Sequence, residues 1–286
     1  MCPRYMRKLY CLIGDPVEHS VSPDMFNAAF RAGGFEDHLY VAMRVGRREL
    51  ISFVKSSRLM GLGGFNVTIP HKMAVADLVD SLDRSAEEVG AVNTVKISRD
   101  SLRGFNTDVM AIQQILPQEI VRGSQATVLG VGGAARAAAV ALKKLGCLRQ
   151  VYVGRRRSRL ADMARFAEDR GIDYMLTKFN SGELSKHLGA SAVIVNATPV
   201  GMHPKIDATP ILPQHIKRGS LIFDMVYNPP TTTLLRNARK RGAVTIGGLE
   251  MLVAQAVESY KIWLGSNPDP AVMRRAAASG LRRYRR

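Results

Sequence analysis

A glycine-rich turn in the middle of the chain constrains its fold more than any other feature. A short apolar run at residues 126–129 leads into the turn Gly130-Val131-Gly132-Gly133-Ala134-Ala135, and an alanine-rich segment then continues to Leu145. A buried strand, a glycine turn and a helix in this order begin a βαβ unit. We therefore expect a parallel sheet with crossover helices, and a dinucleotide site at this turn.

Each small residue of the turn has a separate physical role in that expectation. Gly130 permits the tight turn, Gly132 lets a pyrophosphate approach the backbone, and Ala135 lets the helix pack closely on the strand. The amino end of the helix then faces the anion. A glycine turn without any ligand is the alternative.

Arginines follow the next expected strand, at residues 151–153. About 20 residues after the glycine turn, enzymes that use NAD place an Asp or Glu on the ribose hydroxyls. This chain has four cations there instead, at Arg155, Arg156, Arg157 and Arg159. Guanidinium groups suit a 2′-phosphate by charge and by bidentate geometry. The expected cofactor is therefore NADP.

Strand-like and helix-like segments alternate through all 286 residues, which is enough chain for two domains of ordinary size. In the first half we expect strands at 9–14, 38–45, 64–68 and 92–97, with a helix capped by Ser22 that starts at Pro23. In the second half we expect strands at 126–129, 151–153, 192–195 and 221–223. We expect residues 1–108, completed by helices in 248–286, to form one α/β domain with a mostly parallel sheet. Residues 109–247 would form a Rossmann domain, with a cleft between the two.

The chain is strongly basic, with 41 Lys and Arg against 24 Asp and Glu, a formal charge of +17. Part of the excess lies in the arginine group and part in a C-terminal stretch that ends at Arg285 and Arg286. Such a charge indicates nucleic acid, an acidic membrane surface, anionic small ligands, or simply a solvated surface. No zinc-finger spacing or aromatic-rich ribonucleoprotein motif accompanies it, so nucleic acid stays a secondary hypothesis.

The three cysteines, Cys2, Cys11 and Cys147, are odd in number and widely spaced, which argues against a disulfide framework or a metal site. A reducing compartment fits this usage, and we expect a cytoplasmic protein without a resident metal. The first apolar run stops at Gly14, too soon for a signal peptide, and no stretch has the length of a membrane span.

Two polar clusters supply candidate chemistry. A β-branched strand end stops at Pro70 and is followed by Lys72, and Asp108 closes the later segment 104–108. Strand ends of α/β proteins place side chains in a ligand site, and a lysine there suits proton transfer to an alcohol or ketone oxygen. We expect Lys72 and Asp108 to act together; an ordinary ion pair is the alternative.

Several segments together resemble the shikimate dehydrogenase family, in order and over nearly the whole chain. They are Gly14–Pro23, Asn66–Lys72, Gly90–Thr94, Asn106–Asp108, Asn196–Pro199, Asp224–Pro229 and Gln255 within 248–256. The resemblance implies reversible reduction of 3-dehydroshikimate to shikimate with NADPH, in aromatic amino acid biosynthesis, by a monomer or homodimer.

The resemblance also implies a role for each matched residue. Lys72 and Asp108 would be the catalytic pair, and Ser20 and Ser22 would hold the substrate carboxylate. The ring hydroxyls and the rest of the substrate would contact Thr68, Asn93, Asp108, Gln255 and Tyr227. The cofactor would contact Gly130, Gly132, Gly133, Ala134, Ala135, Arg155, Arg159, Thr198, Met225 and Gly248. Ser22 as an N-cap only, and Tyr227 with a purely structural partner, are the alternatives at those positions.

Two departures from the family pattern stand out. Phe26 replaces a histidine, and Gly154-Arg155-Arg156 replaces an Asn-Arg-Thr segment. Three other functions therefore stay open: a quinate/shikimate dehydrogenase with relaxed use of NAD, a methylenetetrahydrofolate dehydrogenase, and a non-catalytic relative that senses a ligand or binds nucleic acid.

Overall fold

The computed structural model describes residues 8–99 and 101–283, so Cys2, Arg285 and Arg286 lie outside the described residues. The chain divides into two compact units, one made of Met1–Thr107 with Val253–Arg286 and the other of Asp108–Leu252. Both borders fall inside helices, α5 (Thr107–Ile115) and α11 (Gly248–Leu264). The first unit is therefore built from both ends of the chain.

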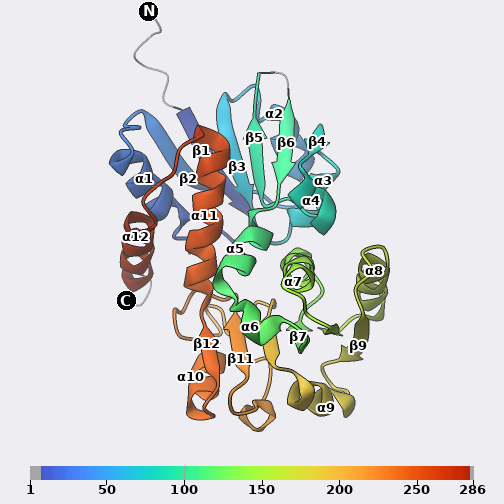
Figure 1. Ribbon diagram of the computed structural model, residues 1–286. Helices are drawn as coiled ribbons and strands as arrows, with labels where there is room; N and C mark the ends of the chain where they lie inside the picture. The colour runs from blue at the N-terminus through green and yellow to red at the C-terminus, as the bar shows by residue number, and fades with distance from the viewer. Residues whose placement is uncertain (1–7, 100, 284–286) are drawn as a thin grey trace, which may run out of the picture. The chain divides into compact units, whose positions relative to one another are not determined.

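The first unit contains one six-stranded sheet with strand order β2-β1-β3-β5-β6-β4 (Figure 1). Its strands are β1 (Lys8–Gly14), β2 (His38–Arg44), β3 (Leu62–Val67), β4 (Ser81–Leu82), β5 (Thr94–Ile97) and β6 (Leu102–Phe105). Strand β5 runs antiparallel to β3 and β6, and the other pairs are parallel. The helices are α1 (Ser22–Ala32), α2 (Leu50–Ser56), α3 (Lys72–Ala76), α4 (Arg84–Val89), most of α11, and α12 (Pro270–Arg283). Helix α12 packs along α1.

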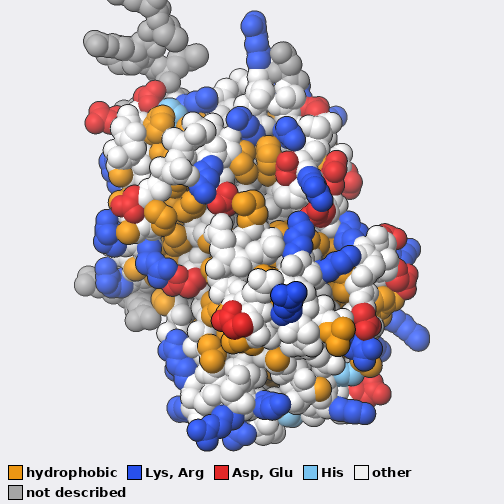
Figure 2. Space-filling view, in the orientation of Figure 1, with side chains coloured by type: hydrophobic (Ala, Val, Ile, Leu, Met, Phe, Trp, Pro, Cys, Tyr) orange, Lys and Arg blue, Asp and Glu red, His pale blue; other side chains and the backbone are white. Residues whose placement is uncertain are grey.

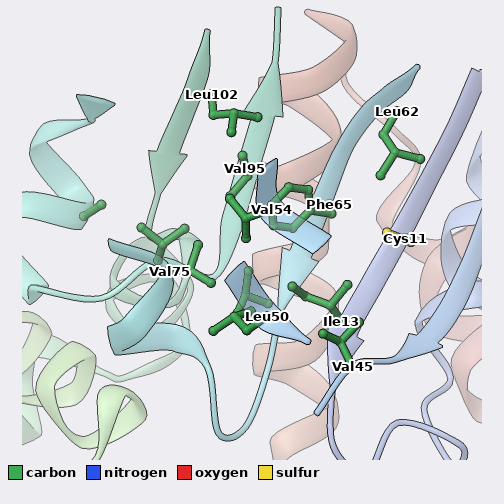
Figure 3. Packing of buried hydrophobic residues seen from close by; sticks show 13 residues of the cluster. Cys11, Ile13, Val45, Leu50, Val54, Leu62, Phe65, Val75, Val95 and Leu102 are labelled. Carbon is green, nitrogen blue, oxygen red and sulfur yellow. The ribbon is translucent and has the colours of Figure 1, made fainter. Parts of the chain in front are cut away.

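Two hydrophobic layers hold this sheet. On one face, apolar residues of β1, β3 and β5 pack against α2 and α3, around Ile13, Phe65 and Val95 (Figure 3). On the other, aromatic rings of α1 and α11 gather on β1 and β2, with Tyr10 and Trp263 at a centroid distance of 4.9 Å. Strand β3 is buried along its whole length, which explains its apolar and glycine-rich sequence.

The second unit contains a six-stranded, fully parallel sheet with strand order β12-β11-β10-β7-β8-β9. Its strands are β7 (Gln125–Leu129), β8 (Arg149–Gly154), β9 (Tyr174–Lys178), β10 (Val193–Asn196), β11 (Leu221–Asp224) and β12 (Val244–Ile246). The helices are α6 (Gln118–Val121), α7 (Gly133–Lys144), α8 (Arg157–Glu168), α9 (Glu183–Ala190), the short η1 (Pro213–His215) and α10 (Thr233–Lys240). Read from the first strand outward, this is the doubly wound order of dinucleotide-binding domains.

The alanine-rich helix behind the glycine turn is buried on a broad face. Ala135 and the run Ala137–Ala139 have no exposed surface. Leu129, at the end of β7, is also fully buried. Small side chains let α7 approach the sheet closely, which is why the sequence uses alanine rather than larger apolar residues.

The structure corrects one sequence expectation at the start of α1. Ser22 is not the N-cap; Val21 is, and no side chain caps the helix. Ser22 is the first helical residue, and its backbone N–H donates to the hydroxyl of Ser20 at 3.2 Å, so a residue upstream of the N-cap binds the first amide of the helix.

The edge and connecting strands β4, β6, β9 and β12 were not expected from the sequence. Strands β4 and β12 have only two and three residues, β6 has an arginine among its four residues, and only one residue of β9 is buried. None of them therefore contains the run of buried apolar residues that indicated the other strands. Among the described residues, no helix combines the length and apolar character that crossing a membrane requires.

Candidate functional site

The turn from β1 to α1 presents two serines. Ser20 and Ser22 are both nearly buried, and the Ser20 hydroxyl donates to that of Ser22 at 3.2 Å. The Ser20 backbone N–H donates to the carbonyl of Val17 at 3.0 Å, which closes the turn. Two hydroxyls are thereby held next to the uncapped amino end of α1, a combination suited to a carboxylate.

Lys72 is the first residue of α3, five residues after the end of β3. Its backbone carbonyl accepts from Val92 N at 2.7 Å, and the preceding His71 side chain donates from Nε2 to the carbonyl of Val45 at 2.6 Å. The half-buried lysine therefore stands on an anchored turn, while Thr68 N donates to Ile13 O at 2.9 Å at the strand end.

A buried polar network lies beside this turn, made of Tyr40, Asn66, Asn93, Thr94, Thr107 and Ser259. Tyr40 OH donates to Asn66 Oδ1 at 2.8 Å, which turns the amide nitrogen of Asn66 toward the other members. That nitrogen lies 3.0 Å from Thr94 Oγ1 and 3.1 Å from Ser259 Oγ. A buried asparagine needs such partners, because an unpaired amide would cost its full desolvation.

The network fixes Asn93 and the residue before Asp108. Asn93 Oδ1 accepts from Thr107 N at 2.9 Å and from Thr94 Oγ1 at 3.0 Å, and its Nδ2 donates to Thr107 Oγ1 at 2.9 Å. Asp108 follows Thr107 directly in α5 and is 2% exposed. The backbone that carries Asp108 is thus tied to the side chain of Asn93.

The network also reaches α11. The hydroxyl of Ser259 lies 2.8 Å from that of Thr94 and donates to the backbone carbonyl of Gln255 at 3.0 Å. Within the first unit the structure therefore links Asn93, the start of α5 and Gln255 through shared hydrogen bonds.

In the second unit, the glycine turn has the form that an anion requires. Gly130 has φ +114°, and a Cβ there would lie 2.9 Å from the carbonyl oxygen of Ala197, so only glycine fits. Around Gly132 nothing lies within 4 Å of a Cβ position, which leaves open space beside the backbone. Helix α7 begins at Gly133 without a side-chain cap or an acidic residue in its first turn, and Ala134 and the buried Ala135 follow. These features fit a pyrophosphate at the helix start.

The arginine group follows β8 directly. Arg155, Arg156, Arg157 and Arg159 are all exposed, and the first turn of α8 contains no acid. Asp162 lies one turn further on, where it pairs with Arg165 at 2.7 Å and more distantly with Arg159 at 4.0 Å. Cations at the positive end of a helix dipole repel it, so a phosphate there would relieve the conflict.

A buried carboxylate organises the segments after β10 and β11. Asp224 accepts from Asn196 at 2.9 Å, from Val226 N at 3.1 Å and from Thr232 at 2.6 Å. Burial raises the pKa of Asp224, while these donors oppose the rise. Asn196 in turn accepts from the hydroxyl of Thr198 at 2.6 Å. We call Asn196, Asp224 and Thr232 the Asp224 cluster.

Gly248 and Met225 meet in the same region. A Cβ on Gly248 would lie 2.6 Å from the carbonyl carbon of Met225, so α11 can begin against this segment only with glycine. Tyr227, two residues beyond Met225, is half-buried. The candidate cofactor residues Gly130 and Thr198 also lie together, since a Cβ on Gly130 would be 3.2 Å from Thr198 Cγ2.

Both departures from the family pattern have a packing explanation. Phe26 is fully buried and stacks on Tyr40 with centroids 4.4 Å apart and planes 9° from parallel. At Gly154 a Cβ would lie 2.9 Å from Leu160 Cδ2, so glycine lets α8 pack closely on the end of β8. Phe26 therefore supports the polar network through Tyr40.

Sequence analysis missed Tyr40, Thr94, Ser259 and the Asp224 cluster as contributors to these sites. One signal was available, because Ser259 follows Gln255 by four residues and so shares its helix face. The contacts of Ser259 with Asn66 and Thr94 join positions 193 and 165 residues apart, which no local pattern reports.

The face of the molecule seen in Figure 2 has no single basic patch. In Figure 2, Lys and Arg side chains are spread over the visible face with Asp and Glu among them, rather than gathered in one patch. Within the described part of the chain, no three His, Cys, Asp or Glu side chains converge as metal ligands would.

Comparison with known proteins identifies the family. Residues 12–95 match the sequence model of the shikimate dehydrogenase substrate binding domain, and residues 248–278 that of the shikimate 5′-dehydrogenase C-terminal domain. A Methanopyrus kandleri protein named shikimate dehydrogenase (NADP(+)) is 40% identical over 276 residues, 95% of each chain. The chain belongs to the shikimate dehydrogenase family.

Solved structures of the family have the same fold. The Thermus thermophilus shikimate 5-dehydrogenase, in complex with NADP(H) and shikimate, has a TM-score of 0.82 at 32% identity and covers 96% of this chain and 99% of its own. A Corynebacterium glutamicum quinate dehydrogenase in complex with NAD has a TM-score of 0.84 at 29% identity, with coverages of 95% and 99%. Structures similar to this chain are thus named for two different substrates and contain two different cofactors.

Proposed function

We propose that this chain catalyses the reversible, NADP-dependent reduction of 3-dehydroshikimate to shikimate. The observation that carries the proposal is the 40% identity, over 95% of both chains, with a relative named shikimate dehydrogenase (NADP(+)). Residues 1–108 together with 248–286 would form the substrate-binding domain. Residues 109–247 would form the NADP-binding domain. These proposed domains differ by a few residues from the two units at each border.

The residues of the second unit fit NADP. The open backbone at Gly132 and the uncapped start of α7 suit the pyrophosphate, with Gly130, Gly133, Ala134 and Ala135 shaping the turn. Arg155 and Arg159 would bind the 2′-phosphate, because no acid occupies the place where NAD enzymes bind ribose hydroxyls. Thr198, Met225 and Gly248 would line the remainder. The cofactor, when bound, supplies or accepts the hydride.

The residues of the first unit would bind and orient the substrate. Ser20 and Ser22 would donate to the carboxylate, and Thr68, Asn93 and Gln255 would hold ring hydroxyls. The family resemblance adds Tyr227 as a further substrate residue. Asn93 suits this task because its amide is fixed by Thr94 and Thr107. A fixed donor loses little freedom on binding, which favours one orientation of the ring.

Proton transfer would fall to Lys72 and Asp108. Lys72, as an ammonium group, would stabilise negative charge on the carbonyl oxygen and donate the proton that makes it a hydroxyl. In the reverse direction, its neutral amine would take that proton back. Asp108 would hold both the lysine and a neighbouring substrate hydroxyl.

A four-way assay tests this function. Purified protein is mixed with shikimate or quinate and with NADP⁺ or NAD⁺, and the initial rate of cofactor reduction is followed by the absorbance of the reduced nicotinamide. We expect the highest kcat/KM with shikimate and NADP⁺. Absence of turnover with every pair would overturn the proposal.

A quinate dehydrogenase with relaxed cofactor use is the second candidate, supported by the similarity to the quinate dehydrogenase in complex with NAD. In the same assay it predicts comparable rates with quinate and with NAD⁺. The four arginines after β8 argue against it, since they favour a phosphorylated ribose.

We further propose that the protein acts in the cytoplasm as a monomer or homodimer, without a nucleic-acid partner. The buried Cys11 and half-buried Cys147 are both free thiols, which suits a reducing compartment. Analytical ultracentrifugation decides the assembly state, and retention on a polynucleotide column at moderate salt would contradict the last point.

A further inference from the structure

Ser259 occupies an unusual position for a small side chain of a helix. It lies in α11, has no exposed surface, and its hydroxyl contacts residues of three other elements or their boundaries. Asn66 of β3 donates to it at 3.1 Å, Thr94 of β5 lies at 2.8 Å, and Thr107 of α5 lies at 3.5 Å. One oxygen therefore joins α11 to the sheet and to the start of α5.

Each of these contacts leads to a residue proposed to hold the substrate. Thr94 donates to Asn93 Oδ1 at 3.0 Å, and Thr107 binds the same side chain and precedes Asp108. On its own helix, Ser259 donates to the carbonyl of Gln255 at 3.0 Å. The serine has no exposed surface and its hydroxyl is bound by protein groups, so we assign its effect on substrate binding to these neighbours.

The hydrogen-bond count shows why an apolar replacement would disturb them. The amide nitrogen of Asn66 has two hydrogens and faces three acceptors, namely the carbonyl of Asn93, Thr94 and Ser259. Tyr40 holds the other end of that amide, so Asn66 cannot simply turn over. Without the serine oxygen, two acceptors remain for the two hydrogens of Asn66, but Thr94 loses the hydroxyl 2.8 Å away and the Gln255 carbonyl loses a donor. Because Thr94 also donates to Asn93, its adjustment changes the setting of the Asn93 side chain.

We propose that Ser259 is a positioning residue that sets the orientation of Asn93 and the place of Gln255 for binding the substrate ring. The inference rests on the proposed function and deepens it. The serine should affect the affinity for the hydroxylated substrate ring. It should not affect the affinity for the cofactor, because the proposed cofactor residues lie in the other unit.

The test compares Ser259→Ala with Ser57→Ala. Ser57 is a fully buried serine of the same unit, but its hydroxyl donates only to the local carbonyl of Val54, at 2.7 Å, and it contacts no proposed site residue. For Ser259→Ala we expect the KM for shikimate to rise about tenfold, with kcat changed less and the KM for NADP⁺ within about twofold of wild type. Ser57→Ala should keep both KM values.

Ser259→Cys keeps the shape of the side chain but weakens its hydrogen bonds, and it replaces the alanine variant if that fails to fold. Its KM for shikimate should lie between wild type and Ser259→Ala. Three results would overturn the positioning role. The first is an unchanged KM for shikimate in folded Ser259 variants, and the second is an equal rise of the KM for shikimate and for NADP⁺. The third is a rise of the KM for shikimate in Ser57→Ala as large as that in Ser259→Ala. Wild-type turnover of shikimate is measured first, because its absence would overturn the proposed function and this inference together.

Discussion

The two proposed ligand regions are built in opposite ways. In the first unit, the substrate residues rest on a buried polar network in which Asn66, Asn93 and Thr94 are held by several hydrogen bonds each. In the second unit, the cofactor region offers bare backbone at Gly132 and exposed cations at Arg155–Arg159. The first region relies on fixed geometry, and the second on charge and open space.

This difference has an energetic consequence. A buried network gives precise orientation, but each removed partner leaves a desolvated polar group, at about 1–3 kcal/mol. Exposed arginines have no such cost, and their attraction for a phosphate is screened by salt. Substitutions in the first region should therefore change stability and substrate binding together, whereas those in the arginine group should change cofactor binding alone.

The largest effect is expected at Lys72, which stands beside the network and would move the proton. Lys72→Ala should lower kcat about 1,000-fold, as removal of a general acid does, with smaller changes in either KM. Steady-state kinetics with shikimate and NADP⁺ measure it. Lys55→Ala removes an exposed lysine of α2 in the same unit and should be silent. Turnover of Lys72→Ala within a few fold of wild type would remove the lysine from the mechanism.

The next largest effect is expected in the arginine group. Arg155→Ala/Arg159→Ala should raise the KM for NADP⁺ about 100-fold, since each charge-assisted hydrogen bond contributes about 1.5–3 kcal/mol, and should leave the KM for NAD⁺ unchanged. The melting temperature should stay near that of wild type because both side chains are exposed.

Two controls sharpen this second prediction. Arg165→Ala removes a cation from the last turn of the same helix and should keep the NADP⁺ affinity. Added salt should raise the NADP⁺ KM of wild type more than that of the double variant. If the double variant raised the KM for NADP⁺ and the KM for NAD⁺ by the same factor, the arginines would not be binding the 2′-phosphate.

The third prediction concerns the Asp224 cluster, a buried polar group in the second unit. Because of this cluster, the contrast between buried polar contacts and exposed charge holds for the two ligand regions and not for the two whole units. Asp224→Asn keeps the shape but places an amide where three donors meet, and the melting temperature should fall by about 5 °C. Asp207→Asn changes an exposed carboxylate of the same unit and should have no effect.

The difference in stability between wild type and Asp224→Asn should depend on pH in a definite direction. Burial raises the pKa of Asp224 in the folded state, so the stability that this group contributes is complete below its unfolded pKa of about 3.9 and is lost as the pH rises. The margin of wild type over Asp224→Asn should therefore be widest near pH 4 and shrink toward neutral pH. Thermal scans across that range would contradict the pKa direction if the margin widened instead.

The smallest effect is expected where α12 packs on α1. A Cβ on Gly280 would lie 2.6 Å from Asp24 Oδ2 and 2.9 Å from Val21 Cγ1, and Val21 stands between the two serines. Gly280→Ala should raise the KM for shikimate about threefold by shifting this turn slightly. Gly189→Ala, in a helix with nothing within 4 Å of its Cβ position, serves as the matched control and should bind normally. Equal KM values for the two variants would show that α12 does not influence the serines.

The same contrast explains what the sequence could predict. Gly130, Gly132 and Ala135 act through their own backbone and the adjoining strand and helix, so a local pattern was enough to place the turn and the parallel order around it. The polar network depends on contacts between distant segments, such as Asn66 with Ser259, and stayed invisible. The wrong N-cap at Ser22 has a different, local origin, because the hydroxyl of Ser20 accepts from the Ser22 amide and the helix begins one residue earlier than expected.

The most direct measurement is one kinetic experiment on two variants, Ser259→Ala and Arg155→Ala/Arg159→Ala, with KM determined for both substrates. The account predicts that the first variant raises only the KM for shikimate and the second only the KM for NADP⁺. If either variant raised both values by the same factor, separate control of the two ligands by these regions would be contradicted.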